Sequence, residues 1–178
     1  MSYKEFIMQR LQTNTATTGG KQVYWSDSYS MGIKLIDDQH KGLLNFVNEL
    51  FDHATGEEEE ERVWFKKVIR YAVQYIREHF TTEEKLMKAT NFPGYAKHKK
   101  THDEFTLTVV KNIRDFQSGK RLVLEKFAYF LKDWILTHVA VMDRQYSDYF
   151  RKIATRKADG KLTITAADLY KERQFIPR

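Results

Sequence analysis

The 178-residue chain contains no cysteine. This absence excludes disulfide bonds, thiolate metal sites, iron–sulfur clusters and cysteine nucleophiles. Any metal that the chain binds must therefore be held by histidine, aspartate or glutamate side chains. The composition fits a reducing compartment, because disulfides are rare there.

Long apolar runs are also missing. The first ten residues, MSYKEFIMQR, contain no apolar stretch of the length that a secretory signal peptide has. No segment approaches the roughly 20 consecutive apolar residues of a membrane-spanning helix. We therefore expect a cytoplasmic protein. The sequence also has no glycine-rich loop of the kind that cradles phosphate, and no Ser/His/Asp arrangement apart from the histidines described below.

The net charge of +6 is spread unevenly along the chain. Residues 151–178 hold eight basic and three acidic residues, and residues 1–24 hold three and one, which leaves −1 for residues 25–150. A basic tail either stays solvated, which we favour, or docks on an acidic protein or a membrane surface. It lacks the folded context of a nucleic-acid-binding module, so we expect no nucleic-acid partner.

Apolar residues recur at the 3.6-residue helical period in four segments, which we place at residues 38–54, 59–89, 95–117 and 121–152. Asp37 is the expected N-cap of the first segment. Turn formers separate the segments: Gly56, then Asn91, Pro93 and Gly94, then Ser118 and Gly119. Four amphipathic helices with short connections predict an all-α, antiparallel up-down-up-down four-helix bundle.

The flanks of this bundle differ from it in composition. Residues 1–23 include the small, polar run QTNTATTGG and are expected to be a flexible leader. The bundle domain is placed at residues 24–153. Residues 22–36 mix aromatic residues with turn formers and are expected to form an ordered, irregular arm that packs on the domain. Residues 154–178 form a short basic C-terminal extension, with a helix near residues 166–173 suggested by its capping pattern.

Five of the six histidines lie on the apolar stripes of the predicted helices. Buried imidazoles without partners would cost several kcal/mol in total, at about 1–3 kcal/mol for each unpaired group, so five in phase point to a shared ligand. In an antiparallel bundle they fall at one end, together with one glutamate and one aspartate. These seven candidate metal ligands are His40, His79, Glu83, His98, His102, His138 and Asp143.

The spacing of the candidate ligands constrains the metal. His79 and Glu83, like His98 and His102, are four residues apart and point the same way. His138 and Asp143 are five apart, about 140° around an ideal helix, and could reach a shared site only from either side. Five imidazoles and two carboxylates exceed one tetrahedral zinc and suit two carboxylate-bridged transition-metal ions. On the residues alone, zinc and manganese stay open.

These motifs resemble those of the bacterial hemerythrins, over about residues 24–150. They are Ile36-Asp37-Asp38-Gln39-His40, His79-Phe80-Thr81-Thr82-Glu83-Glu84, His98-x3-His102, and Trp134-Ile135-Leu136-Thr137-His138 with Asp143. The resemblance implies reversible dioxygen binding at two iron ions joined by an oxo or hydroxo bridge. It implies that His98, His102 and His138 hold one iron. His40 and His79 would hold the other, which keeps an open position, and Glu83 and Asp143 would bridge the pair.

A dry pocket is expected beside the open iron, because water would promote its oxidation. Position relative to the ligands nominates Leu43, Phe80, Trp134, Ile135 and Val139, although ordinary core packing explains each one equally well. Of Asp37, Asp38 and Gln39, which precede His40, one could hydrogen-bond a ligand imidazole, and the alternative role for all three is helix capping, which we favour for Asp37. Glu84 is expected to be solvated or to support a ligand, Tyr75 to be core, and His53 to lie outside the site.

Three functions are compatible with such a site. The leading one is a dioxygen carrier, store or delivery protein rather than an enzyme. The second is a sensor of oxygen, iron or redox state that signals through the C-terminal extension. The third is a di-iron oxidase, peroxidase or nitric oxide-handling protein, which ranks last because the sequence shows no dedicated substrate cleft.

Overall fold

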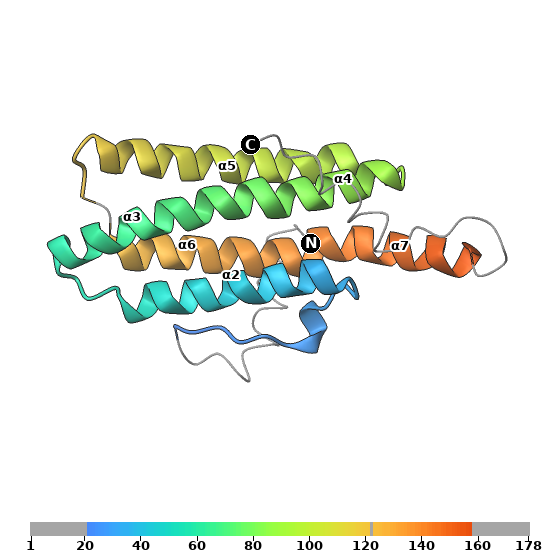
Figure 1. Ribbon diagram of the computed structural model, residues 1–178, viewed down its shortest axis with the longest axis horizontal. Coiled ribbons are helices and arrows are strands. Elements are labelled where there is room, and N and C mark those ends of the chain that lie inside the picture. The colour runs from blue at the N-terminus through green and yellow to red at the C-terminus, as the bar shows by residue number, and fades with distance from the viewer. Residues whose placement is uncertain (1–20, 122, 158–178) are drawn as a thin grey trace, which may run out of the picture.

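Four long helical rods lie side by side and alternate in direction, with an irregular N-terminal arm packed along one side (Figure 1). The computed structural model describes residues 21–121 and 123–157. The predicted up-down-up-down bundle and its irregular arm are therefore confirmed. Residues 1–20 of the leader and most of the C-terminal extension, including the predicted helix near residues 166–173, lie outside the described residues. Val23, the last residue of the predicted leader, is buried, and its backbone is hydrogen-bonded to the Asn48 side chain.

The first rod is α2 (Lys34–Asp52), and the third is α5 (Tyr95–Gln117). The second rod consists of α3 (Glu58–Tyr75), the π-helical segment η3 (Ile76–Phe80) and α4 (Thr81–Ala89). The fourth consists of α6 (Leu124–Thr137), the π-helical segment η4 (His138–Asp143) and α7 (Arg144–Lys157). A short 3-10 helix, η2 (Asp27–Tyr29), lies in the arm. The predicted rods are thus correct, but the sequence analysis missed both π-helical segments.

The turns follow from residues that tolerate a left-handed backbone. Gly56, between α2 and α3, and Gly119, after α5, both have a φ of 84°, which a residue with a Cβ rarely adopts. Asn91, after α4, has a φ of 53°. Glu61 links the α2–α3 turn to the start of α6. Its buried carboxylate accepts hydrogen bonds from the backbone N–H groups of Gly56 and Leu124.

Asp37 does not cap the first helix, because α2 begins three residues earlier, at Lys34. Its buried carboxylate instead accepts hydrogen bonds from the Met31 backbone N–H at 2.7 Å and the Ser30 hydroxyl at 2.6 Å. The arm is also held from the fourth rod, where Ser147 donates to the Met31 carbonyl at 2.8 Å. These contacts fix the arm against α2 and α7.

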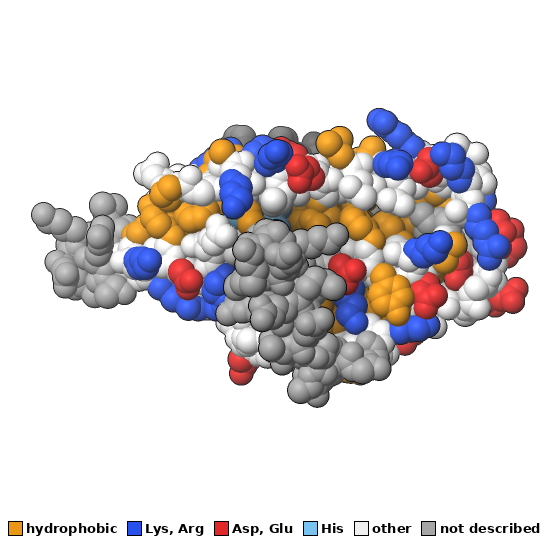
Figure 2. All heavy atoms as spheres, turned by 180° about the vertical axis from the view of Figure 1, so that it is seen from behind, with side chains coloured by type: hydrophobic (Ala, Val, Ile, Leu, Met, Phe, Trp, Pro, Cys, Tyr) orange, Lys and Arg blue, Asp and Glu red, His pale blue; other side chains and the backbone are white. Residues whose placement is uncertain are grey.

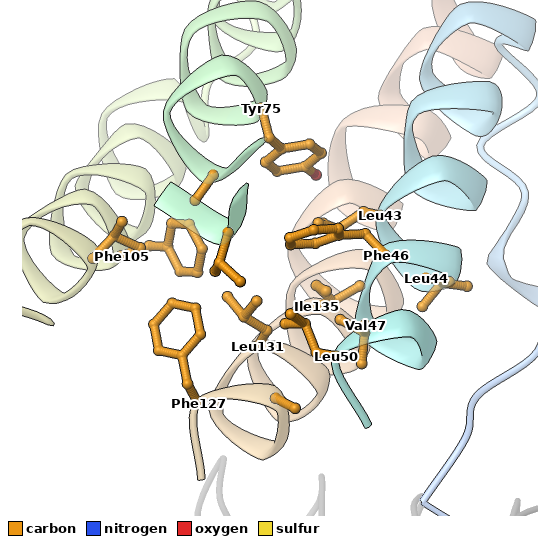
Figure 3. Packing of buried hydrophobic residues seen from close by; sticks show 14 of the residues in the cluster. Leu43, Leu44, Phe46, Val47, Leu50, Tyr75, Phe105, Phe127, Leu131 and Ile135 are labelled. Atoms are coloured by element: carbon orange, nitrogen blue, oxygen red, sulfur yellow. The ribbon is translucent and has the colours of Figure 1, made fainter. Parts of the chain in front are cut away.

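A hydrophobic core fills the space between the rods (Figure 3). Leu43, Val47 and Leu50 of α2 meet Leu131 and Ile135 of α6 along the interior. At roughly 25 cal/mol per Å² of buried apolar surface, this packing is the main stabilising contribution to the bundle. A smaller cluster around Leu86, Met87 and Tyr146 closes the bundle end that carries the histidines.

The outer surface mixes charged side chains of both signs with a band of hydrophobic ones on the face shown in Figure 2. The exposed hydrophobic side chains include Leu107, which is 68% exposed, and Val63, which is 58% exposed. Within the described residues, no helix combines the length and the apolar composition needed to cross a bilayer.

Candidate metal centre

All seven predicted ligands point into one buried cluster at the end of the bundle. Each is at most 3% exposed, and Glu83, Asp143 and His79 are fully buried. Their metal-binding atoms form two groups, within each of which the atoms lie no more than 4.8 Å apart. Glu83 belongs to both groups. The sixth histidine, His53, lies outside the cluster, with its ring 3.6 Å from that of Trp64.

The first group contains three imidazoles from the third and fourth rods. The Nε2 atom of His102 lies 3.1 Å from that of His98 and 3.0 Å from that of His138. Glu83 Oε2 lies 3.3 Å from His98 Nε2 and 3.2 Å from His102 Nε2. About 3 Å is the separation of neighbouring ligands around an ion bound at about 2.1 Å.

The second group contains the other two imidazoles and is completed by the same carboxylates. Asp143 Oδ2 lies 3.2 Å from His40 Nε2, and Glu83 Oε1 lies 3.4 Å from His79 Nε2. The remaining oxygen of Asp143, Oδ1, faces the first group, 3.1 Å from His138 Nε2 and 3.4 Å from His98 Nε2. Each carboxylate therefore presents one oxygen to each group of imidazoles.

The π-helical segment η4 corrects the expected geometry of His138 and Asp143. On an α-helix they would diverge by about 140°. In η4 the hydrogen bonds run from residue i to i+5, which widens the turn so that side chains five apart point the same way. His138 and Asp143 consequently face the same point, with Nε2 and Oδ1 3.1 Å apart.

The cluster fits a metal, because several of its buried polar atoms have no protein partner. His40 Nε2, His79 Nε2 and both oxygens of Asp143 are buried without a hydrogen bond. A buried, unpartnered polar group costs about 1–3 kcal/mol, and a charged one costs more. Imidazoles and carboxylates converging in this way suit a transition-metal cation, which would satisfy these atoms together.

Burial and mutual charge shape the protonation of the cluster. Burial lowers the pKa of His79 to about 3, despite the nearby Glu83 charge. Burial alone would raise the pKa of Glu83, but the imidazoles of His79, His102 and His98 outweigh it and hold that pKa well below its usual range. Burial alone would lower the pKa of His40, but the nearby Asp143 carboxylate outweighs burial, and the pKa of His40 is raised above its usual value. Glu83 is thus ionised and His79 is neutral at pH 7, and these are the forms in which a carboxylate and an imidazole can bind a metal.

Three of the candidate ligands, two imidazoles and one carboxylate, contact a second polar residue outside the cluster. Gln39 Oε1 lies 2.9 Å from His79 Nδ1, which confirms the expectation that a residue just before His40 supports a ligand imidazole. Glu84 Oε1 lies 3.2 Å from His102 Nδ1. The hydroxyl of Tyr146 donates to Glu83 Oε1 at 2.7 Å, a contact that the sequence analysis missed. Such contacts orient ligands and tune their basicity.

The five predicted pocket residues do not line one pocket. Two of them stack on imidazole rings, two border a crevice at His40, and one lies in the hydrophobic core. Phe80 stacks on His102 at 3.7 Å between ring centroids, and Trp134 stacks on His138 at 4.3 Å. Ile135 and Val139 instead border a narrow crevice at His40. Leu43 lies in the hydrophobic core between the rods (Figure 3).

Sequence analysis missed four of the residues that line the crevice beside His40, namely Trp25, Tyr29, Leu44 and Leu136. Trp25 and Tyr29 belong to the arm, whose predicted packing on the bundle is confirmed, although its place beside His40 was not predicted. Tyr75, expected in the core, is buried and stacks on His79 at 4.6 Å.

Comparison with known proteins places this cluster in a family. The model of the hemerythrin HHE cation binding domain matches residues 31–150, a range that includes all seven candidate ligands. The chain belongs to the hemerythrin family. The family resemblance proposed from the sequence motifs is therefore confirmed, and the His/Glu/Asp cluster is the candidate cation site of this family member.

Relatives in several organisms support the assignment. The chain is 31% identical over 124 residues to a bacteriohemerythrin of Stenotrophomonas maltophilia, covering 70% of this chain and 78% of that protein. It is 32% identical over 127 residues to a bacteriohemerythrin of Pseudomonas aeruginosa, covering 71% and 80%. A myohemerythrin of Theromyzon tessulatum is 27% identical over 122 residues, covering 68% and 88%.

Solved structures agree with the sequence relatives. The crystal structure of wild-type hemerythrin superposes with a TM-score of 0.64 at 27% identity, covering 71% of this chain and 95% of that chain. A leucine-to-alanine mutant of hemerythrin gives a TM-score of 0.65 at 27% identity, covering 72% and 97%. The residues matched by the family model, 31–150, cover most of the four rods and leave out the predicted leader and basic extension.

Proposed function

We propose that this protein binds dioxygen reversibly at a non-haem di-iron centre. His98, His102 and His138 would hold one iron, and His40 and His79 the other. Glu83 and Asp143 would bridge them, together with an oxo or hydroxo group. The ions would supply the electrons and the open coordination position, while the protein positions the ligands and excludes water.

The division of the two carboxylates is the observation that carries this proposal. One side of the cluster offers three imidazole nitrogens and one oxygen from each carboxylate. The other side offers two imidazole nitrogens and the remaining two carboxylate oxygens. The second side thus has one donor fewer, which supports an open position beside His40 and His79. Two ferrous ions with both carboxylates and one hydroxide would bury a net charge of only about +1, which limits the cost of burial.

On the side of the predicted open position, the surroundings of His40 are apolar, whereas a cavity beside His79 is lined partly by polar side chains such as Gln39 and Gln74. The crevice beside His40 is lined by apolar and aromatic side chains, including Trp25, Ile135 and Val139, and it is too narrow to hold a water molecule. Water gains few hydrogen bonds on such a surface, whereas dioxygen needs none. Exclusion of water protects a reduced metal site from oxidation, so the lining supports binding that can be reversed.

A spectroscopic cycle tests the proposal. The protein is loaded with iron, its metal content is measured, and it is reduced without oxygen. We expect two irons per chain and a visible charge-transfer band that appears under air and disappears under argon over repeated cycles. Irreversible oxidation on first exposure to air would contradict a carrier and favour a redox sensor or an oxidase.

Phe80 gives a test of water exclusion. Its ring covers the face of His102 and contacts Trp134, so Phe80→Ala is expected to keep the metal but to oxidise faster in air. Phe65→Ala is the matched control, because Phe65 is an equally buried aromatic residue that packs on Phe116 and Phe127 instead. Either truncation is expected to lower the free energy of unfolding by about 3–5 kcal/mol. Equal oxidation rates in the two variants would show that Phe80 does not shield the site.

A further inference from the structure

Tyr146 on α7 donates a short hydrogen bond to one of the two shared carboxylates. Its hydroxyl lies 2.7 Å from Glu83 Oε1, and both residues are fully buried. Hydrogen bonds from a hydroxyl to a carboxylate are roughly twice as strong as bonds between neutral groups. The two residues are 63 positions apart in the chain, so only the folded bundle creates this contact.

The hydrogen bond from Tyr146 gives Glu83 a protein donor that Asp143 lacks. It falls on Oε1, the oxygen of Glu83 that faces His40 and His79, and leaves Oε2 to face His98 and His102. Neither oxygen of Asp143 has a hydrogen-bond partner in the described structure. His40 Nε2 lies 3.2 Å from Asp143 Oδ2 and 3.9 Å from Glu83 Oε1.

We propose that Tyr146 is a positioning residue that holds Glu83 with one oxygen toward each imidazole group and draws negative charge away from Oε1. This role rests on the di-iron centre proposed above. A carboxylate oxygen that accepts a strong hydrogen bond donates less charge to a metal, which disfavours the higher oxidation state of that metal. Tyr146 would therefore help to keep the iron at His40 and His79 reduced.

Packing alone does not explain a tyrosine here. The ring of Tyr146 lies against Leu86 and Met87 and closes the bundle end, a task that phenylalanine would perform equally well. The hydroxyl adds a donor inside an apolar cluster, and the acceptor it meets is a candidate metal ligand. A buried hydroxyl needs such a partner, so its presence requires Glu83 to keep its orientation.

Tyr146→Phe separates the hydroxyl from the ring. We expect the variant to fold and to retain two irons per chain, because the ring and all seven ligands remain. At a fixed applied potential, the ratio of reduced to oxidised protein should fall by about tenfold, as expected for the loss of one hydrogen bond to a charged group. Autoxidation should accelerate, and the visible spectrum of the oxidised protein should shift.

Tyr149→Phe is the matched control, since Tyr149 is on the same helix and its hydroxyl donates to the carbonyls of Thr90 and Asn91. It should leave the potential and the spectrum unchanged. Replacing Tyr146 with a ring-fluorinated tyrosine gives a second test that keeps the packing. Its more acidic hydroxyl should donate more strongly and shift the ratio of reduced to oxidised protein in the opposite direction.

Iron content measured on the same samples distinguishes the ways in which the test could fail. Two irons per chain, with potentials and spectra unchanged in both Tyr146 variants, would overturn the role of Tyr146 and leave the di-iron centre intact. Fewer than two irons in the wild-type protein would overturn both proposals. If Tyr149→Phe shifts the reduction potential as much as Tyr146→Phe does, the proposed role of Tyr146 is also overturned. Such a result would mean that losing any hydroxyl contact of α7 changes the site.

Discussion

Glu83→Gln is expected to abolish binding of the metal pair. Glu83 contributes to both halves of the cluster, with Oε1 near His79 and Oε2 near His98 and His102. An amide has one oxygen and no charge, so it cannot serve both sides. Iron affinity should fall by more than about 100-fold, beyond the 10–100-fold loss typical of residues that only orient a ligand. Elemental analysis and calorimetric titration measure this loss.

Glu84→Gln is the matched control for this substitution, one position along the same helix. Glu84 contacts His102 Nδ1 at 3.2 Å and has a partly exposed side chain, so it supports a ligand without facing the metal. Its substitution should weaken iron binding less than Glu83→Gln and should keep the stoichiometry. Full retention of two irons by the Glu83→Gln variant would contradict the assignment of Glu83 as a bridge.

Acid is expected to destabilise the metal-free protein through His79. In the folded state burial lowers the pKa of this imidazole to about 3, against a reference value of 6.5. Below pH 6.5 the unfolded chain takes up a proton that the folded chain refuses. The stability from a neutral His79 is therefore fully present above pH 6.5 and is lost as pH falls from 6.5 toward 3.

Two neighbouring histidines act in the opposite direction. Burial alone would lower the pKa of His40 and of His98. The charge of Asp143 beside His40, and that of Glu83 beside His98, outweigh burial, so both pKa values lie above the reference of 6.5. Their contribution is present below pH 6.5 and is lost as pH rises through the raised values. The effect of His79 must therefore be measured as a difference between two proteins.

His79→Phe removes this titrating group, and the phenyl ring preserves the stack on Tyr75. Denaturant unfolding of both metal-free proteins between pH 7.5 and 4 should give a steeper acid decline for the wild type, by up to about 1.4 kcal/mol per pH unit. Parallel curves would show that His79 titrates normally when buried. In the loaded protein the same proton competes for Nε2, so acid should also release the iron.

The rods and the clustering of the candidate ligands could be predicted from the sequence because helical periodicity and residue spacing are short-range patterns. The apolar period of α5, for example, places His98 and His102 one turn apart, and the segment was predicted at 95–117, the range that the structure shows. The antiparallel order of the four rods then brought all seven ligands to one end. The family match over residues 31–150 agrees with these motifs.

The errors lie where distant parts of the chain decide the local geometry. Asp37 looks like an N-cap in the sequence, but its carboxylate holds the arm through Met31 and Ser30. The mix of aromatic residues and turn formers predicts an arm that packs on the domain, but no local pattern shows that it packs against α2 and α7. The aromatic residues Trp25 and Tyr29 reach the crevice beside His40 for the same reason.

The sequence by itself determined that four amphipathic helices would bury five histidines and two carboxylates, because helical periodicity and residue chemistry are local properties. Only the tertiary structure decided how those groups face one another. A π-helical segment such as η4 departs from the regular α-helical hydrogen-bond pattern and has no composition signal, so the packed rods, and not local preference, bring His138 and Asp143 together. The contacts of Gln39 and Tyr146 likewise join residues 40 and 63 positions apart, a separation that no sequence period encodes.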